Sequence, residues 1–190
     1  MPAGLATHIK KFVDLTEEEA SILLTYTRPL EIKKKGFLLK EGQVCRANYF
    51  VEKGCLRLFF IDEKGTEQTV QFAIENWWVT DYTGFRSQAP SHFYIQAVEN
   101  SKITVFERST QDGLFAKLPQ LERYFRLILE KSYGASQWRI KYIFSLSKEN
   151  MYKQFIASFP AFVQRIPQYM LASYLGLTPE YVSEIRKKKS

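Results

Sequence analysis

The polar side chains that could do chemistry are concentrated near the C-terminus. The segment from Gln168 to Lys189 has the sequence QYMLASYLGLTPEYVSEIRKKK. On a helix that turns Val182 and Ile185 inward, the outward residues are Thr178, Pro179, Glu180, Ser183, Glu184 and Lys187. Hydroxyl and carboxylate groups can bond to base edges, and cations can pair with phosphates. This face therefore predicts contact with double-stranded DNA, with Gln168 as a further contact and with Arg186, Lys187, Lys188 and Lys189 lying along the phosphates.

Two short helices joined by a tight turn would hold this face in place. Their shared core would consist of the apolar residues Leu171, Leu175, Leu177, Val182 and Ile185, with the small Ala172 where the helices cross. Gly176 can end the first helix in a left-handed conformation. Thr178 offers an N-cap hydroxyl, and Pro179 suits the first helical position. This order predicts a helix-turn-helix; the alternative is an ordinary helical hairpin with a basic end.

The distribution of charge agrees with a nucleic-acid partner. The chain has 190 residues and a formal net charge of +7. Residues 148–190 hold seven Lys and Arg against three Glu, whereas residues 1–147 hold 20 basic against 17 acidic residues. The basic excess is thus concentrated around the predicted helix-turn-helix. Mild basicity that only aids solubility is the alternative.

Other chemistries find little support in the sequence. Cys45 and Cys55 are too few for a disulfide scaffold or an iron–sulfur site, and they indicate a reducing compartment. His8 and His92 are far apart, and no metal-ligand cluster, nucleophile elbow or P-loop is present. We therefore predict no catalytic residues, no metal and no enzyme activity. No apolar run of membrane length and no signal peptide is found, so we expect a cytoplasmic protein without a membrane partner.

Residues 30–109 are predicted to form strands. Runs rich in β-branched and aromatic residues, such as ANYFVEKG and CLRLFFIDEKG, alternate with turn signals at residues 52–54 and 62–65. Several short strands at this spacing are typical of a sandwich or barrel. Before them, residues 5–28 are expected to be helical, with a capping box formed by Thr16 and Glu19 and an end at Pro29.

The segment from Gly36 to Leu58 has the pattern G-x-L-L-K-E-G-Q-x-C-x-x-x-Y-F-V-x-x-G-x-L-R-L. It resembles the β-roll of the cyclic-nucleotide-binding domain superfamily, and with the helix-turn-helix the whole chain resembles Crp/Fnr-type transcriptional regulators. The resemblance implies an α+β fold with a double-stranded β-helix (jelly-roll-like) sensor domain over 1–115, a dimerisation helix over 116–146 and a helix-turn-helix DNA-binding domain over 147–190. It also implies a homodimeric DNA-binding transcriptional regulator, with RNA polymerase as a further partner. The alternative is a ligand-sensing or protein-interaction module that no longer binds DNA.

The chain departs from the family pattern in two regions, the effector cassette and the recognition helix. Family members that bind cyclic nucleotides have Gly-Glu-Leu and then an Arg that neutralises the cyclic phosphate; here Thr80 and Asp81 stand for the Gly and Glu, and Ser91 stands for the Arg. A buried phosphate without a cation is unfavourable, so we expect no cyclic nucleotide, no control by cyclic AMP and no other cofactor. Glu184 stands where the family usually has an Arg that reads guanine.

The aromatic region around these positions leaves two alternatives open. One is a core that fills the former ligand pocket, which we favour, and the other is a pocket for a different small effector. The candidate residues for such an effector pocket are Trp78, Asp81, Tyr82, Arg86, Ser91, His92 and Tyr94.

Residues 110–146 are predicted to be helical, with Pro119 starting or kinking the long part. Residues at three- and four-residue spacing form a stripe that we expect to face a second copy: Leu121, Phe125, Ile128, Ser132 and Ala135. The alternative is a helix packed only on its own domain. Ser147 is the candidate hinge and N-cap before the last domain.

Overall fold

The computed structural model describes residues 3–187, and the chain divides into two compact units. The first unit comprises the chain up to Phe60 together with Val70–Leu129, and the second comprises Ile61–Thr69 together with the chain from Glu130 onward. No helix within residues 3–187 combines the length and apolar content that a membrane crossing requires.

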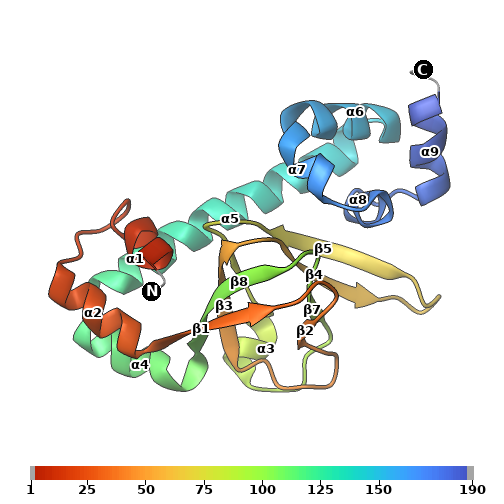
Figure 1. Cartoon of the computed structure of the whole chain (residues 1–190). Coiled ribbons are helices and arrows are strands. Elements are labelled where there is room, and N and C mark those ends of the chain that lie inside the picture. Colours follow the sequence, from red (N-terminus) through yellow and green to blue (C-terminus); the bar gives the residue numbers. More distant parts are fainter. Residues whose placement is uncertain (1–2, 188–190) are drawn as a thin grey trace. The chain divides into compact units, whose positions relative to one another are not determined.

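Two four-stranded antiparallel sheets form the centre of the fold (Figure 1). The first has the order β1-β8-β3-β6, with β1 at Thr27–Ile32, β8 at Ser101–Glu107, β3 at Ala47–Lys53 and β6 at Trp78–Val79. The second has the order β2-β7-β4-β5, with β2 at Phe37–Leu39, β7 at Tyr94–Ala97, β4 at Leu56–Ile61 and β5 at Glu67–Ala73. The two separate sheets confirm the predicted mixed fold as a sandwich and not a closed barrel.

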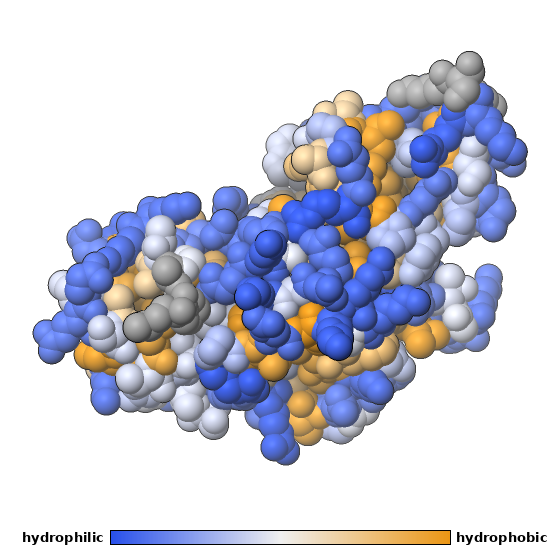
Figure 2. All heavy atoms as spheres, in the orientation of Figure 1, coloured by the Kyte–Doolittle hydropathy of each residue, from blue (hydrophilic) through white to orange (hydrophobic). Residues whose placement is uncertain are grey.

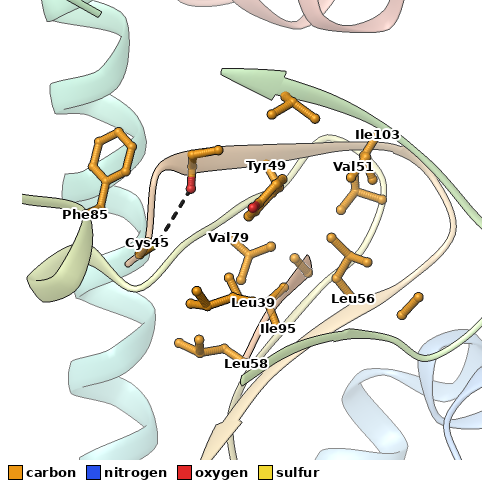
Figure 3. Packing of buried hydrophobic residues seen from close by; sticks show 14 residues of the cluster. Leu39, Cys45, Tyr49, Val51, Leu56, Leu58, Val79, Phe85, Ile95 and Ile103 are labelled. Carbon is orange, nitrogen blue, oxygen red and sulfur yellow. Dashed lines mark hydrogen bonds between the residues drawn. The ribbon is translucent and has the colours of Figure 1, made fainter. Parts of the chain in front are cut away.

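The space between the two sheets is filled with apolar side chains (Figure 3). The first sheet contributes Tyr49, Val51, Ile103 and Val105, and the second contributes Leu39, Leu56, Leu58, Ile95 and Ala97. Because side chains alternate along a strand, the neighbours of these residues point to the opposite face of each sheet. This alternation gives β3 and β8 a second buried face.

Helices cover that second face of the first sheet. Phe50, Trp78 and Phe106 pack there against α1 (Ala3–Ile9), α2 (Glu17–Thr25), α4 (Arg108–Lys117) and the start of α5 (Gln120–Ser145). The capping box is confirmed, since Thr16 Oγ1 accepts from Glu19 N at 3.2 Å and Glu19 Oε2 accepts from Thr16 N at 2.8 Å.

One expectation about a helix end was wrong. Pro29 does not end a helix but lies within β1, which is an edge strand, where the missing N–H of proline is tolerated. Pro119, in contrast, stands directly before α5, as expected of a proline that starts the long helix, and it separates α5 from α4.

The second unit is mainly helical. It contains the later part of α5, then α6 (Lys148–Ser158), α7 (Pro160–Arg165), α8 (Gln168–Tyr174) and α9 (Pro179–Lys187). Ser147 caps α6 as predicted, with its hydroxyl accepting from Asn150 N at 3.2 Å. The turn of the β4–β5 hairpin also belongs to this unit, with Gly65 at φ +76° and Asp62 Oδ1 accepting from Lys64 N and Thr66 N.

Candidate nucleic-acid interface

The turn between α8 and α9 has the backbone geometry that the sequence predicts. Gly176 lies at φ +66°, in the left-handed region. Gly176 N donates to Ser173 O at 3.1 Å and Leu177 N donates to Ala172 O at 2.9 Å. These two bonds form a Schellman motif, which satisfies carbonyl groups that a helix end otherwise leaves open. The motif ends α8 and redirects the chain within two residues.

Helix α9 begins immediately after this turn. Tyr181 N donates to Thr178 Oγ1 at 3.2 Å, so Thr178 is the N-cap, and Pro179 occupies the first helical position. Val182 and Ile185 are 0% and 2% exposed, Leu171, Ala172, Leu175 and Leu177 are buried as well, and α8 and α9 contact each other. Burial of this stripe fixes the rotation of α9 about its axis.

The opposite face of α9 is open to solvent. Exposed residues on it are Thr178, Pro179, Glu180, Ser183, Glu184, Arg186 and Lys187. Figure 2 shows hydrophilic residues along the outer side of this helix. Lys188 and Lys189 were also predicted to contact DNA, and they lie outside the described residues.

Gln168 links this face to α8. Its Nε2 donates to Ser183 Oγ at 3.3 Å, and its Oε1 accepts from Arg186 Nη1 at 3.0 Å. Ser183 Oγ in turn donates to Pro179 O at 2.9 Å. The structure therefore brings Gln168, Ser183 and Arg186 together and holds the Arg186 guanidinium beside the start of α8.

Two residues that the sequence analysis missed anchor the other end of α8. Arg139 on α5 donates from Nη2 to Tyr174 O at 2.7 Å and to Thr69 O at 3.3 Å, and its guanidinium lies 4.2 Å from the centroid of the Tyr174 ring. Burial lowers the pKa of Arg139, and Tyr174 acts in the opposite direction. Ser173 Oγ donates to Glu67 O at 2.6 Å and accepts from Thr69 N at 2.8 Å. These contacts satisfy backbone groups on the free edge of β5.

The region aligned with a cyclic-nucleotide cassette is occupied by its own side chains. Asp81 is 4% exposed and caps α3 (Tyr82–Ser87), with Oδ1 accepting from Thr83 N and Gly84 N at 3.1 Å each. Its Oδ2 accepts from Ser91 Oγ at 2.7 Å. Both carboxylate oxygens therefore have partners within the chain. A Cβ on Gly84 would lie 2.4 Å from Asp81 Oδ2, so glycine is needed for this close approach.

No hydrogen bond in the described part of the chain joins the other predicted effector side chains to the Asp81–Ser91 pair. Trp78 lies on the helix-covered face of the first sheet, where its Nε1 donates to Tyr124 Oη at 2.8 Å. Tyr94 stacks on Phe59 at 5.0 Å and donates to Glu41 Oε2 at 3.1 Å. The remaining three, Tyr82, Arg86 and His92, are exposed.

The exposed apolar stripe on α5 differs from the predicted dimer contact. Leu121 has 0% exposure and packs in its own unit with Tyr124, so its side chain is not available to a second copy. Phe125 and Ile128 pack against the same cluster, Ser132 is half-buried and Ala135 is exposed. The exposed stripe consists of Leu129 (41% exposed), Tyr133 (68%), Ile140 (54%) and Ile143 (49%), with the exposed Ser136 between Tyr133 and Ile140. Alternating steps of four and three residues are typical of a coiled-coil seam.

Comparison with known proteins defines the class of the sheet domain first. Residues 29–117 match the family model described as the cyclic nucleotide-binding domain. The fumarate and nitrate reduction regulatory protein of Escherichia coli (strain K12) is 25% identical over 171 residues, which cover 83% of this chain and 67% of that protein.

Solved structures share the fold over most of the chain. FixK2 from Bradyrhizobium japonicum has a TM-score of 0.72 at 15% identity, covering 85% of this chain and 83% of FixK2. The global regulator CLP from Xanthomonas campestris has a TM-score of 0.76 at 12% identity, covering 91% of each chain. The family-model match, the curated relatives and these shared folds together support a Crp/Fnr-type transcription regulator, in agreement with the resemblance noted from the sequence.

Proposed function

We propose that this regulator binds double-stranded DNA as a homodimer through the outward face of α9, without control by cyclic AMP and without enzyme activity. One observation carries the proposal: Val182 and Ile185 are buried while the opposite face of α9 is open. In a helix-turn-helix this second helix lies in the major groove, with its N-terminal residues at the base edges.

The residues of this face divide between two tasks. Glu180 and Ser183 lie in the first half of α9, where they would select bases, Glu by accepting from cytosine. Arg186 and Lys187 lie in its last turn and would pair with phosphates, together with Lys188 and Lys189. Gln168 would keep Arg186 in position through the 3.0 Å bond between them. Contact with RNA polymerase stays a prediction from the sequence.

The exposed stripe on α5 supports the homodimer. A coiled-coil seam removes such apolar side chains from water, and two copies related by a two-fold axis would present two α9 helices to half-sites about 34 Å apart. Ile140→Asp would place a charge in the seam. We expect it to convert a dimer into a monomer in light scattering, while Ser145→Asp, which adds the same charge at an exposed position outside the stripe, keeps the dimer. A dimer that survives Ile140→Asp would contradict this arrangement.

The Asp81–Ser91 pair supports the independence from cyclic AMP. A cyclic nucleotide would have to displace Ser91 from Asp81 and bury its phosphate without an Arg at that position. Calorimetric titration of the purified protein with cyclic AMP should give no heat of binding. Micromolar affinity would overturn this part of the proposal.

DNA selection from a random library, followed by fluorescence anisotropy, tests the central activity. Lys187→Ala should weaken binding to all sequences, because it removes a phosphate contact, whereas Ser183→Ala should relax preference at one base pair. Lys34→Ala is the matched control, since Lys34 is an exposed lysine in the first unit. If no sequence is enriched and no duplex is bound at low salt, the protein-interaction alternative stands.

A further inference from the structure

A hollow in the first unit contains none of the residues proposed above to bind DNA or an effector. Its volume is about 430 Å³, within the range of small-molecule pockets. Its walls come from β1, β2, the start of β3 and the end of β8, through Arg28, Leu38, Leu39, Ala47, Tyr49 and Glu107. The segment that leads into β3 closes one side and contributes Arg46.

The charges around this hollow are unbalanced. Arg28 Nε and Nη2 both donate to Glu107 Oε1, at 3.3 Å and 3.0 Å, so this arginine and this carboxylate neutralise each other. Arg46 is exposed, and its guanidinium forms no ion pair with any residue that the structure describes. The hollow therefore presents one surplus positive charge.

The residues at the floor of the hollow are almost completely buried, so they offer a ligand only a small apolar surface. Leu39 and Ala47 are each 3% exposed and belong to the core between the two sheets. Tyr49 is 8% exposed, and its hydroxyl donates to Leu38 O at 3.2 Å. Burial raises the pKa of Tyr49, so the phenol stays neutral at physiological pH and adds no negative charge. A ligand would find one cation at the rim and a small apolar area at the base.

A planar guanidinium matches a carboxylate with two parallel hydrogen bonds, a geometry that a neutral group cannot reproduce. An apolar body would cover the Leu39 and Ala47 surface. A dianion would exceed the single surplus charge and would face the Glu107 carboxylate. We propose that this hollow binds a small organic monocarboxylate, with its carboxylate on Arg46 and its hydrocarbon part on the floor formed by Leu39, Ala47 and Tyr49.

Nuclear magnetic resonance titration of the full chain with benzoate tests this site. We expect saturable shifts at the amides of Val44, Arg46 and Ala47, and at least about tenfold weaker binding of the neutral isostere benzamide. Arg46→Gln should weaken benzoate binding by about the same factor, and Arg46→Lys, which keeps the charge but loses the planar fork, by less. Arg123→Gln, at an exposed arginine on α5 outside the hollow, should leave it unchanged.

Three results would overturn the proposal. They are the absence of saturable shifts at these amides, equal binding of benzamide, or equal loss in Arg46→Gln and Arg123→Gln. DNA binding is not part of the readout. Failure here therefore leaves the proposed function intact, and failure to bind DNA leaves this site intact.

Discussion

The α8–α9 pair and the Asp81–Ser91 region use the same local device in opposite ways. In both, an oxygen-bearing side chain caps a short helix: Thr178 caps α9 and Asp81 caps α3. After Thr178, the polar side chains of α9 point into solvent. At Asp81, the remaining oxygen is bonded to Ser91, and both residues are buried. Polar groups that bond to one another stabilise the fold, whereas polar groups left open remain available to a partner.

The largest effect is expected when a carboxylate is introduced on the buried face of α9 in one variant and on its exposed face in another. Val182→Asp would bury a carboxylate without a partner and should destabilise the second unit by about 4 kcal/mol or more. Ser183→Asp places the same group on the exposed face and should change stability by less than about 0.5 kcal/mol. Urea denaturation measures both. Similar losses of unfolding free energy in the two variants would contradict the assignment of Val182 to the buried face of α9 and of Ser183 to the exposed face.

Asp81→Ala tests the closed region. It removes the cap of α3 and leaves buried donors without their acceptor, so we expect a loss of about 2–3 kcal/mol in the free energy of unfolding. Asp112→Ala removes an exposed carboxylate whose only described ion pair is with Arg108, and it should cost less than about 1 kcal/mol. If Asp81→Ala had the same free energy of unfolding as the unchanged protein, the claim that Asp81 stabilises the fold would be contradicted.

Arg139→Ala tests the support behind α8. Without the guanidinium, Tyr174 O and Thr69 O lose a donor, and the second unit should lose about 2 kcal/mol of stability. Hydrogen exchange at the amides of α8 would show the loss locally. Arg139→Lys, with one cationic group but no planar fork, should recover only part of it. Unchanged protection of α8 in Arg139→Ala would contradict the anchoring role.

Thr178→Ala has the smallest expected effect. Loss of the N-cap hydroxyl should cost about 1 kcal/mol, and Thr178→Ser should restore most of it because the oxygen is retained. Thermal unfolding followed by circular dichroism is sufficient. If Thr178→Ser were as destabilising as Thr178→Ala, the methyl group and not the cap would be the important part.

Features that depend on neighbouring residues could be predicted from the sequence. The Gly176 turn, the Thr178 cap and the inward positions Val182 and Ile185 each follow from residues a few positions apart. The Arg139–Tyr174 and Ser173–Thr69 contacts could not, because no local pattern reports that residues 35 and 104 positions apart meet.

Two other errors have a physical cause in periodicity. Leu121, Phe125 and Ile128 follow the same four-and-three spacing as the exposed stripe, so spacing alone cannot tell which stripe faces the core of the subunit. Trp78 and Val79 are neighbours on a two-residue strand and point to opposite sides of the sheet. A one-residue change of phase therefore moves an aromatic ring from one core to the other.

The most direct test of the account is the salt dependence of DNA binding. With a selected duplex, the logarithm of the association constant should fall linearly with the logarithm of salt concentration. If Arg186 and Lys187 in each of two copies release counterions, the slope should be about −3.6 or steeper. Lys187→Ala removes one cation from each copy and should make the slope shallower by about 2. A slope near zero, or one that Lys187→Ala leaves unchanged, would contradict the claim that the outward face of α9 binds DNA.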